Sequence, residues 1–233
     1  MSALVRMRLA GFVRSGRALA PVIAAVVVLA VVHGGGQSAA APAYGYSAVM
    51  LFPVLAWQAK LLLDAEPDVQ RRLARLSVGP SREASAGLLA AAALGAVFCA
   101  VAMVVPWWPF HAIRGPLPGS GEPSTAAGIA LGVLAHLLAL PAAVALGALA
   151  SRAVTRTVRN GIAVLVSGAV LAVVLGLSDS IAPWLVPPVM ATARALAADA
   201  APPGGTLLLL AGWTLAWCAV ALAGYARLRR SRS

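Results

Sequence analysis

Side chains that could carry out chemistry are few in this 233-residue chain, and they stand far apart. The seven carboxylates all lie outside the centres of the apolar stretches: Asp64, Glu66, Asp68, Glu83, Glu122, Asp179 and Asp199. The three histidines, His33, His111 and His136, have no metal-ligand spacing, and Cys99 and Cys218 stand singly. A proton-coupled transporter usually needs an ionisable residue deep in the bilayer, so the positions of the carboxylates argue against this class of protein. We therefore expect no catalytic residue, no metal site and no cofactor-binding site in this chain.

His136 is the titratable residue that lies well inside an apolar stretch. A polar group at that depth indicates a ligand or substrate contact. A neutral imidazole bonded to a backbone carbonyl or to a serine of a neighbouring helix explains it as well, and we favour that structural interpretation. An intramembrane hydrolase or lipid-modifying enzyme would pair His136 with an activated serine, for which Ser167 is the candidate at similar depth. The segment 164–169 has no nucleophile signature, so an enzyme is the alternative rather than the expectation.

A site for ATP hydrolysis is also missing from the sequence. A phosphate-cradling loop places a lysine after a glycine, but the sole lysine, Lys60, stands between Ala59 and Leu61. Any energy from ATP must therefore come from another chain.

The composition predicts that the chain folds within a membrane. The chain is 61% hydrophobic and 11% charged, with a mean hydropathy of +0.89, whereas about 25% charged residues is usual in soluble domains. About 20 helical residues span a bilayer core. We expect an all-α polytopic membrane protein, with residues 1–233 forming a single transmembrane domain. Its six transmembrane helices are predicted at about 18–32, 46–63, 84–107, 125–151, 161–177 and 206–228.

The first stretch also has the features of a secretory signal, because a basic start and an apolar run precede small residues at 38–43. We expect it to be retained as a span, and cleavage stays the alternative. Sixteen of the 18 Lys and Arg residues lie on one side of the predicted spans. Short basic loops remain in the cytoplasm, so both termini are predicted to be cytoplasmic in a plasma (cytoplasmic) membrane. The net charge of +11 favours anionic membrane lipids, and not nucleic acid, as partners.

The connection at 64–83 carries the most specific pattern. Pro67 can begin a short helix, and Gly79 and Pro80 can end it. Val69, Leu73 and Leu76 follow at spacings of four and three, which predicts an apolar stripe. A surface-lying amphipathic helix and a docking element fit this spacing equally well.

The layout resembles the membrane subunits of type-2 ABC exporters. The matching positions follow the short helix and lead into the third span: Leu76, Gly79, Pro80, Ser81, Arg82 and Gly87. The resemblance implies that 69–76 is a cytoplasmic coupling helix gripped by an ATPase subunit. The residues expected to couple to that ATPase are Val69, Arg71, Arg72, Leu73, Arg75, Leu76 and Glu83. The loop before the fifth span is short for this family.

Two more segments are similar to that family. Residues 1–17 are expected to form an N-terminal amphipathic interfacial helix before the first span. The segment 178–205 is expected to form a re-entrant element before the last span. An interfacial hairpin anchored by Trp184 is its alternative.

The expected function is that of a permease subunit, without enzyme activity of its own, for ATP-driven export of an apolar or amphipathic drug, lipid or peptide. Its partners would be an ATPase chain holding ATP and Mg²⁺, and a second permease copy or paralogue. Trp57, Gln58 and His136 are the predicted substrate-path residues. A non-transporting membrane scaffold is a further alternative, since the same spans would suffice for it.

Overall fold

The computed structural model describes residues 1–231, except for the side chain of Asp68, and about 75% of the chain is helical. Arg232, which belongs to the basic residues counted above, lies outside the described residues. Two short strands, β1 (Ser38–Ala39) and β2 (Ile113–Arg114), pair in parallel. A short 3₁₀ helix, η1, covers Pro183–Leu185. The α-helices are α1 (Ser2–Arg14), α2 (Leu19–His33), α3 (Ala40–Leu63), α4 (Asp68–Val78), α5 (Pro80–Val104), α6 (Thr125–Leu149), α7 (Arg152–Thr155), α8 (Val158–Val174), α9 (Val189–Ala197) and α10 (Gly204–Arg230).

Among the described residues, 4 helices are long and apolar enough to cross a membrane, namely α3, α5, α6 and α10. A fifth is added if α1 and α2, which meet at an angle of 80°, are counted together as one span. The predicted fifth span corresponds to α8, which has 17 residues and is shorter than these four helices. The chain is therefore a helical protein with four to five apolar helices suited to a membrane.

The core lies around α3, which is mostly buried, and α6 packs along it. Gly128 and Gly132, which the sequence spaces four apart, allow this close approach. A β-carbon on Gly132 would lie 2.6 Å from the ring of Tyr44, and one on Gly128 would lie 2.8 Å from Ala40. Small residues permit such contact where dispersion must hold helices together. These two glycines therefore form a packing face of α6 against α3.

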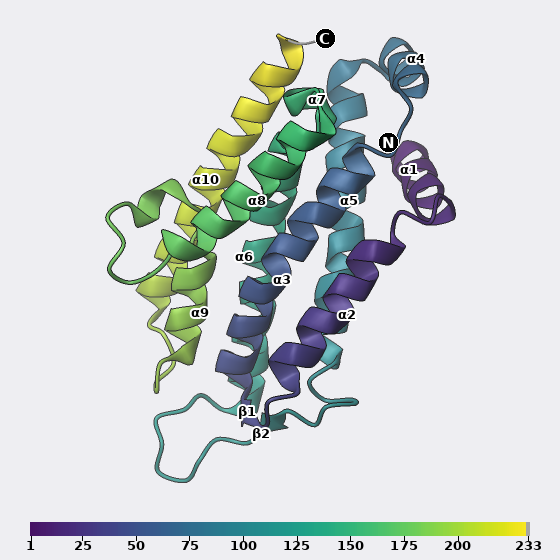
Figure 1. The fold of residues 1–233 in the computed structure, drawn as a ribbon. Coiled ribbons are helices and arrows are strands. Elements are labelled where there is room, and N and C mark those ends of the chain that lie inside the picture. Colours follow the sequence, from purple (N-terminus) through teal and green to yellow (C-terminus); the bar gives the residue numbers. More distant parts are fainter. Residues whose placement is uncertain (232–233) are drawn as a thin grey trace.

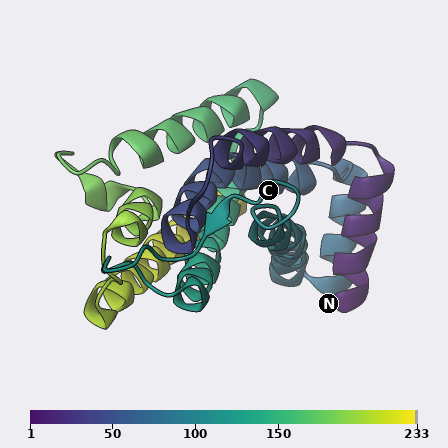
Figure 2. The same cartoon turned by 90° about the horizontal axis from the view of Figure 1, so that it is seen from below.

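The two segments that the family resemblance singled out are both helical. In Figure 2, α1 and α2 form a corner at the edge of the bundle. Phe12 of α1 is 1% exposed and packs against residues of α3 and α5. The segment 178–205 contains η1 and α9, and α9 packs on α3, where Gly45 lies against Ala193 and Leu196. Whether α1 lies at a membrane surface and whether 178–205 re-enters the membrane stay predictions.

The bundle has two unlike ends. Figure 1 shows α1, α4, α7 and the C-terminal turns of α10 at one end, which carries most of the basic residues and is called the basic end below. The opposite end holds β1, β2 and the long 105–124 connection, and is called the loop end. There Arg114 pairs with Glu122 at 2.7 Å within that connection. The structure therefore gathers at one end the basic segments that the sequence separates.

Candidate functional site

The site is the helix α4 together with the ion cluster beneath it at the basic end. Pro67 precedes the helix, and Gly79 ends it with φ +86°. That backbone conformation is open to glycine and costly for other residues, so it allows a sharp turn into α5. Pro80 then occupies the first turn of α5, where a missing N–H costs nothing. The sequence thus places a short helix at an angle on the end of a long one.

One face of α4 is fixed to the bundle by arginines. Arg71 donates to the backbone oxygens of Leu63 and Glu66 at 3.2 and 3.4 Å. Arg75 donates to the carboxylate of Glu83 at 3.4 Å. The helix is therefore held in place although it has few apolar contacts of its own.

The other face of α4 is apolar and exposed. The side chains of Val69, Leu73 and Leu76 are 68%, 60% and 85% exposed. Arg72 is exposed as well. The sequence correctly places the three apolar residues on one stripe, and no part of the described chain covers them.

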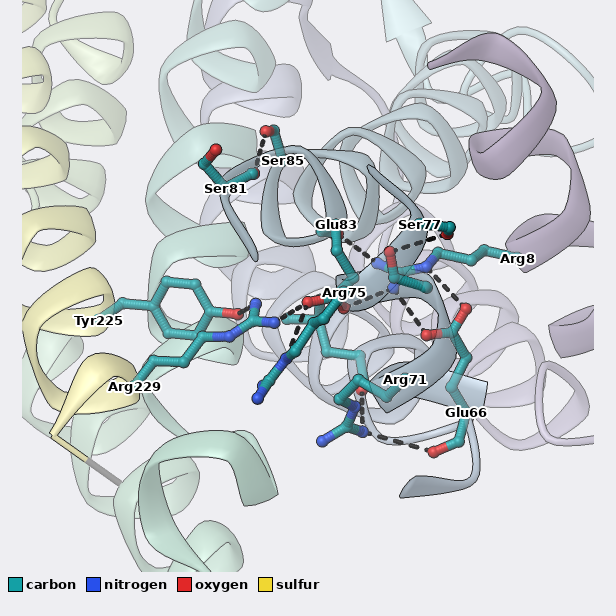
Figure 3. A network of polar contacts seen from close by, with 12 residues as sticks. Arg8, Glu66, Arg71, Arg75, Ser77, Ser81, Glu83, Ser85, Tyr225 and Arg229 are labelled. Carbon is teal, nitrogen blue, oxygen red and sulfur yellow. Dashed lines mark hydrogen bonds and ion pairs between the residues drawn. The ribbon is translucent and has the colours of Figure 1, made fainter. Parts of the chain in front are cut away.

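Glu83 lies at the centre of the cluster and is 2% exposed. Arg8 of α1 donates to one carboxylate oxygen of Glu83 at 2.6 Å and to its backbone oxygen at 3.0 Å. Arg229 of α10 and Arg75 of α4 donate to the other carboxylate oxygen. Figure 3 shows the three guanidinium groups converging on Glu83. Ion pairs to a buried carboxylate are strong because little water screens them.

The cluster extends beyond Glu83 in both directions. Arg8 also donates twice to Glu66, at 2.7 and 2.6 Å. Arg229 donates to the hydroxyl of Tyr225, one turn earlier in α10, at 2.9 Å. The cluster therefore connects α1, α4, α5, α10 and the loop between α3 and α4.

A second carboxylate joins further elements nearby. Asp64 accepts a hydrogen bond from Lys60 at 2.9 Å and one from the backbone N–H of Arg152 at 2.7 Å. Arg152 is the first residue of α7, so Asp64 satisfies an N–H group that the helix itself leaves without an acceptor. This contact fixes α7 to the end of α3.

The predicted coupling residues thus fall into two groups. Val69, Arg72, Leu73 and Leu76 lie on the surface, whereas Arg71 and Arg75 point to the bundle and Glu83 is buried. Sequence reasoning missed the partners of Glu83. Arg8 and Arg229 are 75 and 146 residues away from it, and no motif links them. The only signal was an excess of arginines beside a lone carboxylate at the start of an apolar helix.

The three predicted path residues are not brought together. Gln58 is fully buried, close to Gly95 of α5, and its amide has no hydrogen-bond partner among the described residues. Trp57 lines an open apolar groove between α3 and α8 with a volume of about 710 Å³. His136 lies at a different level, on α6.

His136 has the bonding of a structural histidine. Its Nδ1 lies 2.8 Å from the backbone oxygen of Gly132, and its Nε2 lies 3.3 Å from the hydroxyl of Ser47 on α3. Ser47 and His136 are 0% and 3% exposed, so a substrate could reach the pair only after rearrangement of the helices. Ser167 is exposed on α8 and is not this partner. The hydrogen bonds match the interpretation favoured from the sequence.

Metal-binding groups of three or more His, Cys, Asp or Glu side chains are absent from the described residues. Comparison with protein-family models, with curated proteins and with solved structures found no match to this chain. The functional conclusion therefore depends on the geometry of the basic end.

Proposed function

We propose that the chain is one permease half of an ATP-driven exporter. In this proposal α2, α3, α5, α6, α8 and α10 are six membrane crossings, and the basic end faces the cytoplasm with both termini. A separate ATPase subunit holds ATP and Mg²⁺ and binds α4. The chain itself performs no chemistry on the substrate.

The single observation that carries the proposal is the two-sided character of α4. One face is fixed by Arg71 and Arg75, and the other exposes Val69, Leu73 and Leu76. Exposed apolar stripes on a helix mark sites of protein or membrane contact. An 11-residue helix that only rested on lipid would not need polar contacts into the bundle. The ion pair of Arg75 with Glu83 and the hydrogen bonds of Arg71 therefore favour a helix that transmits displacement to the bundle.

In this proposal the Glu83 cluster transmits a displacement of α4 to other helices. A partner that binds α4 differently in its two nucleotide states shifts the equilibrium between two arrangements of the permease. Arg75 ties α4 to Glu83 on α5, and Glu83 in turn holds Arg8 of α1 and Arg229 of α10. Motion of α4 would therefore move α1, α5 and α10 together rather than bend a single loop.

The substrate path would form between two permease copies, either identical or paralogous. The groove of about 710 Å³ between α3 and α8 is lined by Pro53, Trp57, Leu165 and further apolar residues. Such a lining suits apolar or amphipathic molecules, such as a drug, a lipid or a peptide with apolar side chains.

The test is a co-purification with a charge placed on the stripe. A tagged chain extracted from its native membrane in mild detergent should retain a nucleotide-hydrolysing subunit. Leu73→Glu should reduce that subunit and the associated ATP hydrolysis by at least about tenfold, because a charge would have to lose its water at the interface. Leu117→Glu is the matched control, because Leu117 is 54% exposed at the loop end. The proposal fails if no such subunit co-purifies, or if the two variants behave alike.

A further inference from the structure

Between α7 and α10 the polypeptide passes along the bundle in two helical pieces. The first piece, α8, has 17 residues, or about 26 Å of helix, which is less than a hydrocarbon core of about 30 Å. The second piece, α9, adds 9 residues, or about 14 Å. Together they match the 27-residue α10, which is about 40 Å long. The residues between the two pieces, 175–188, include η1 and are called the break below.

The break lies halfway along the bundle. Trp217, at the centre of the 27-residue α10, donates from its indole Nε1 to the backbone oxygen of Leu185 at 3.0 Å. Each end of α10 is therefore about 20 Å from this contact along the helix. At the end of the break, Pro188 lines a small space together with Ala48 of α3 and Ala139 of α6. Figure 1 likewise shows the connection between α8 and α9 leaving the bundle at about half its height.

From the break, α9 continues toward the loop end. Ala193 of α9 lies against Gly45, which stands in the second turn of α3 at that end. Beyond α9, the backbone oxygen of Asp199 lies 3.0 Å from the position that a β-carbon on Gly121 would take. Gly121 belongs to the 105–124 connection of the loop end. The helix α9 therefore completes the passage that α8 begins at the basic end.

Polar groups in the break lack partners. The backbone N–H groups of Ser178, Asp179 and Ile181 have no acceptor in the described part of the chain. Asp179 is exposed, and its carboxylate accepts one hydrogen bond, from the hydroxyl of Ser178 at 3.3 Å. Within residues 1–231, no arginine or lysine forms an ion pair with Asp179. By contrast, the backbone oxygen of Gly176 accepts from Arg194 of α9.

A segment of this kind is costly in contact with lipid. Lipid tails cannot form hydrogen bonds, so irregular backbone at membrane depth occurs where it is buried in protein or lines a water-filled space. A carboxylate at that depth is likewise paired with a cation or faces such a space. A neighbouring protein would have to bring a cation for Asp179, whereas water satisfies both the carboxylate and the backbone groups. Water is therefore the partner that fits the break.

We propose that α8 and α9 form one discontinuous membrane crossing, and that its break faces a water-filled space at mid-depth. The apolar groove between α3 and α8 reaches Val174, the last residue of α8, so an apolar wall adjoins the water-facing segment. A molecule with an apolar part and a polar part would find a surface for each. The inference requires only that the chain is embedded in a membrane, and it does not depend on an ATPase partner.

The test compares single added cysteines in membrane fragments that are open on both sides. Ser178→Cys places a thiol in the break. Val220→Cys is the matched control, because Val220 is 74% exposed on α10 only three residues after Trp217. The native Cys99 and Cys218 are buried, so they contribute little labelling. A water-soluble, positively charged thiol reagent should label Ser178→Cys at least about tenfold faster, because the reactive thiolate forms in water and not in lipid.

Two labelling results would overturn the proposal. Equally slow labelling of both variants would mean that the break faces lipid or protein. Equally fast labelling would mean that this level of the bundle lies outside the membrane.

A second measurement tests the break without a thiol. Asp179→Leu should leave the unfolding temperature in lipid nanodiscs unchanged relative to Asp199→Leu, since both carboxylates are exposed and, in this proposal, both face water. A higher unfolding temperature for Asp179→Leu would contradict the proposal, because removing a charge from lipid contact stabilises a membrane protein. Neither measurement involves nucleotide, so a failure here is distinct from a failure of the proposed transport function.

Discussion

The two halves of the bundle are held together by different forces. At the basic end, Glu83 gathers arginines from three helices. Toward the loop end, Gly132 lets the ring of Tyr44 approach α6, and the contact consists of dispersion with few polar bonds. Charges can be arranged in alternative pairings at small cost in geometry, whereas interdigitated side chains have one good arrangement. If the chain switches as proposed, we therefore expect the basic end to rearrange and the other half to stay rigid.

The largest loss of stability is expected when the central charge of the basic end is removed, and this loss tests the contrast between the two halves. Glu83→Gln leaves three arginines around a neutral amide, so we expect a loss of about 3–5 kcal/mol of stability, the usual effect of breaking a buried ion pair. Thermal unfolding in detergent, followed with a thiol-reactive fluorophore, can measure it, because Cys99 and Cys218 are both buried. Glu122→Gln, in the Arg114 pair at the loop end, is the control and should change little. If Glu83→Gln and Glu122→Gln lost the same stability, Glu83 would not be the residue that holds the basic end together.

The second prediction tests the packed half. A β-carbon on Gly132 would meet the ring of Tyr44 at 2.6 Å, so Gly132→Ala should force α6 away from α3 at a cost of about 1–3 kcal/mol. Gly212→Ala on α10 is the matched control, because open space surrounds that position. There the substitution should be neutral or slightly stabilising, since alanine favours helix. Similar behaviour of both variants in the same thiol assay would mean that the α3–α6 contact can relax without cost.

Sequence reasoning predicted the features that depend on residues close together in the chain. It missed those that depend on residues far apart in the chain. Apolar runs and basic flanks located the long helices. The stripe on α4 also followed from spacing alone. The Glu83 cluster could not be predicted, because its partners lie 75 and 146 residues away and depend on how α1 and α10 pack. Helix boundaries were also beyond the pattern: the span predicted at 161–177 is α8 at Val158–Val174, and the apolar composition continues past the residue where α8 ends.

The third prediction concerns the polar contact that borders the packed half. The hydroxyl of Tyr44 donates to the backbone oxygen of Met103 at 2.9 Å and accepts from Trp107 at 2.7 Å. Tyr44→Phe removes both bonds while keeping the ring against Gly132, so the loss should be about 1 kcal/mol, smaller than for Gly132→Ala. Tyr46→Phe is the control, because Tyr46 is 50% exposed. A larger loss for Tyr44→Phe than for Gly132→Ala would mean that hydrogen bonds, and not packing, hold this half.

The smallest effect is expected at the loop end, where the only acid of the 105–124 connection makes a local contact. The Arg114 guanidinium, followed by the backbone N–H of Leu117, lowers the pKa of Glu122 from 4.5 to about 2. Because the folded-state pKa is lowered, the contact stabilises the connection above about pH 4.5 and is lost as the pH falls toward 2. The readout is the protection factor of the Leu117 amide, which donates to Glu122 at 2.9 Å. Glu122→Gln should abolish the pH dependence and leave the α3–α6 contact unchanged. If instead global unfolding of the native chain followed the same pH range, the loop end would be linked to the core as closely as the Glu83 cluster is, and the contrast between a switching end and a rigid half would not hold.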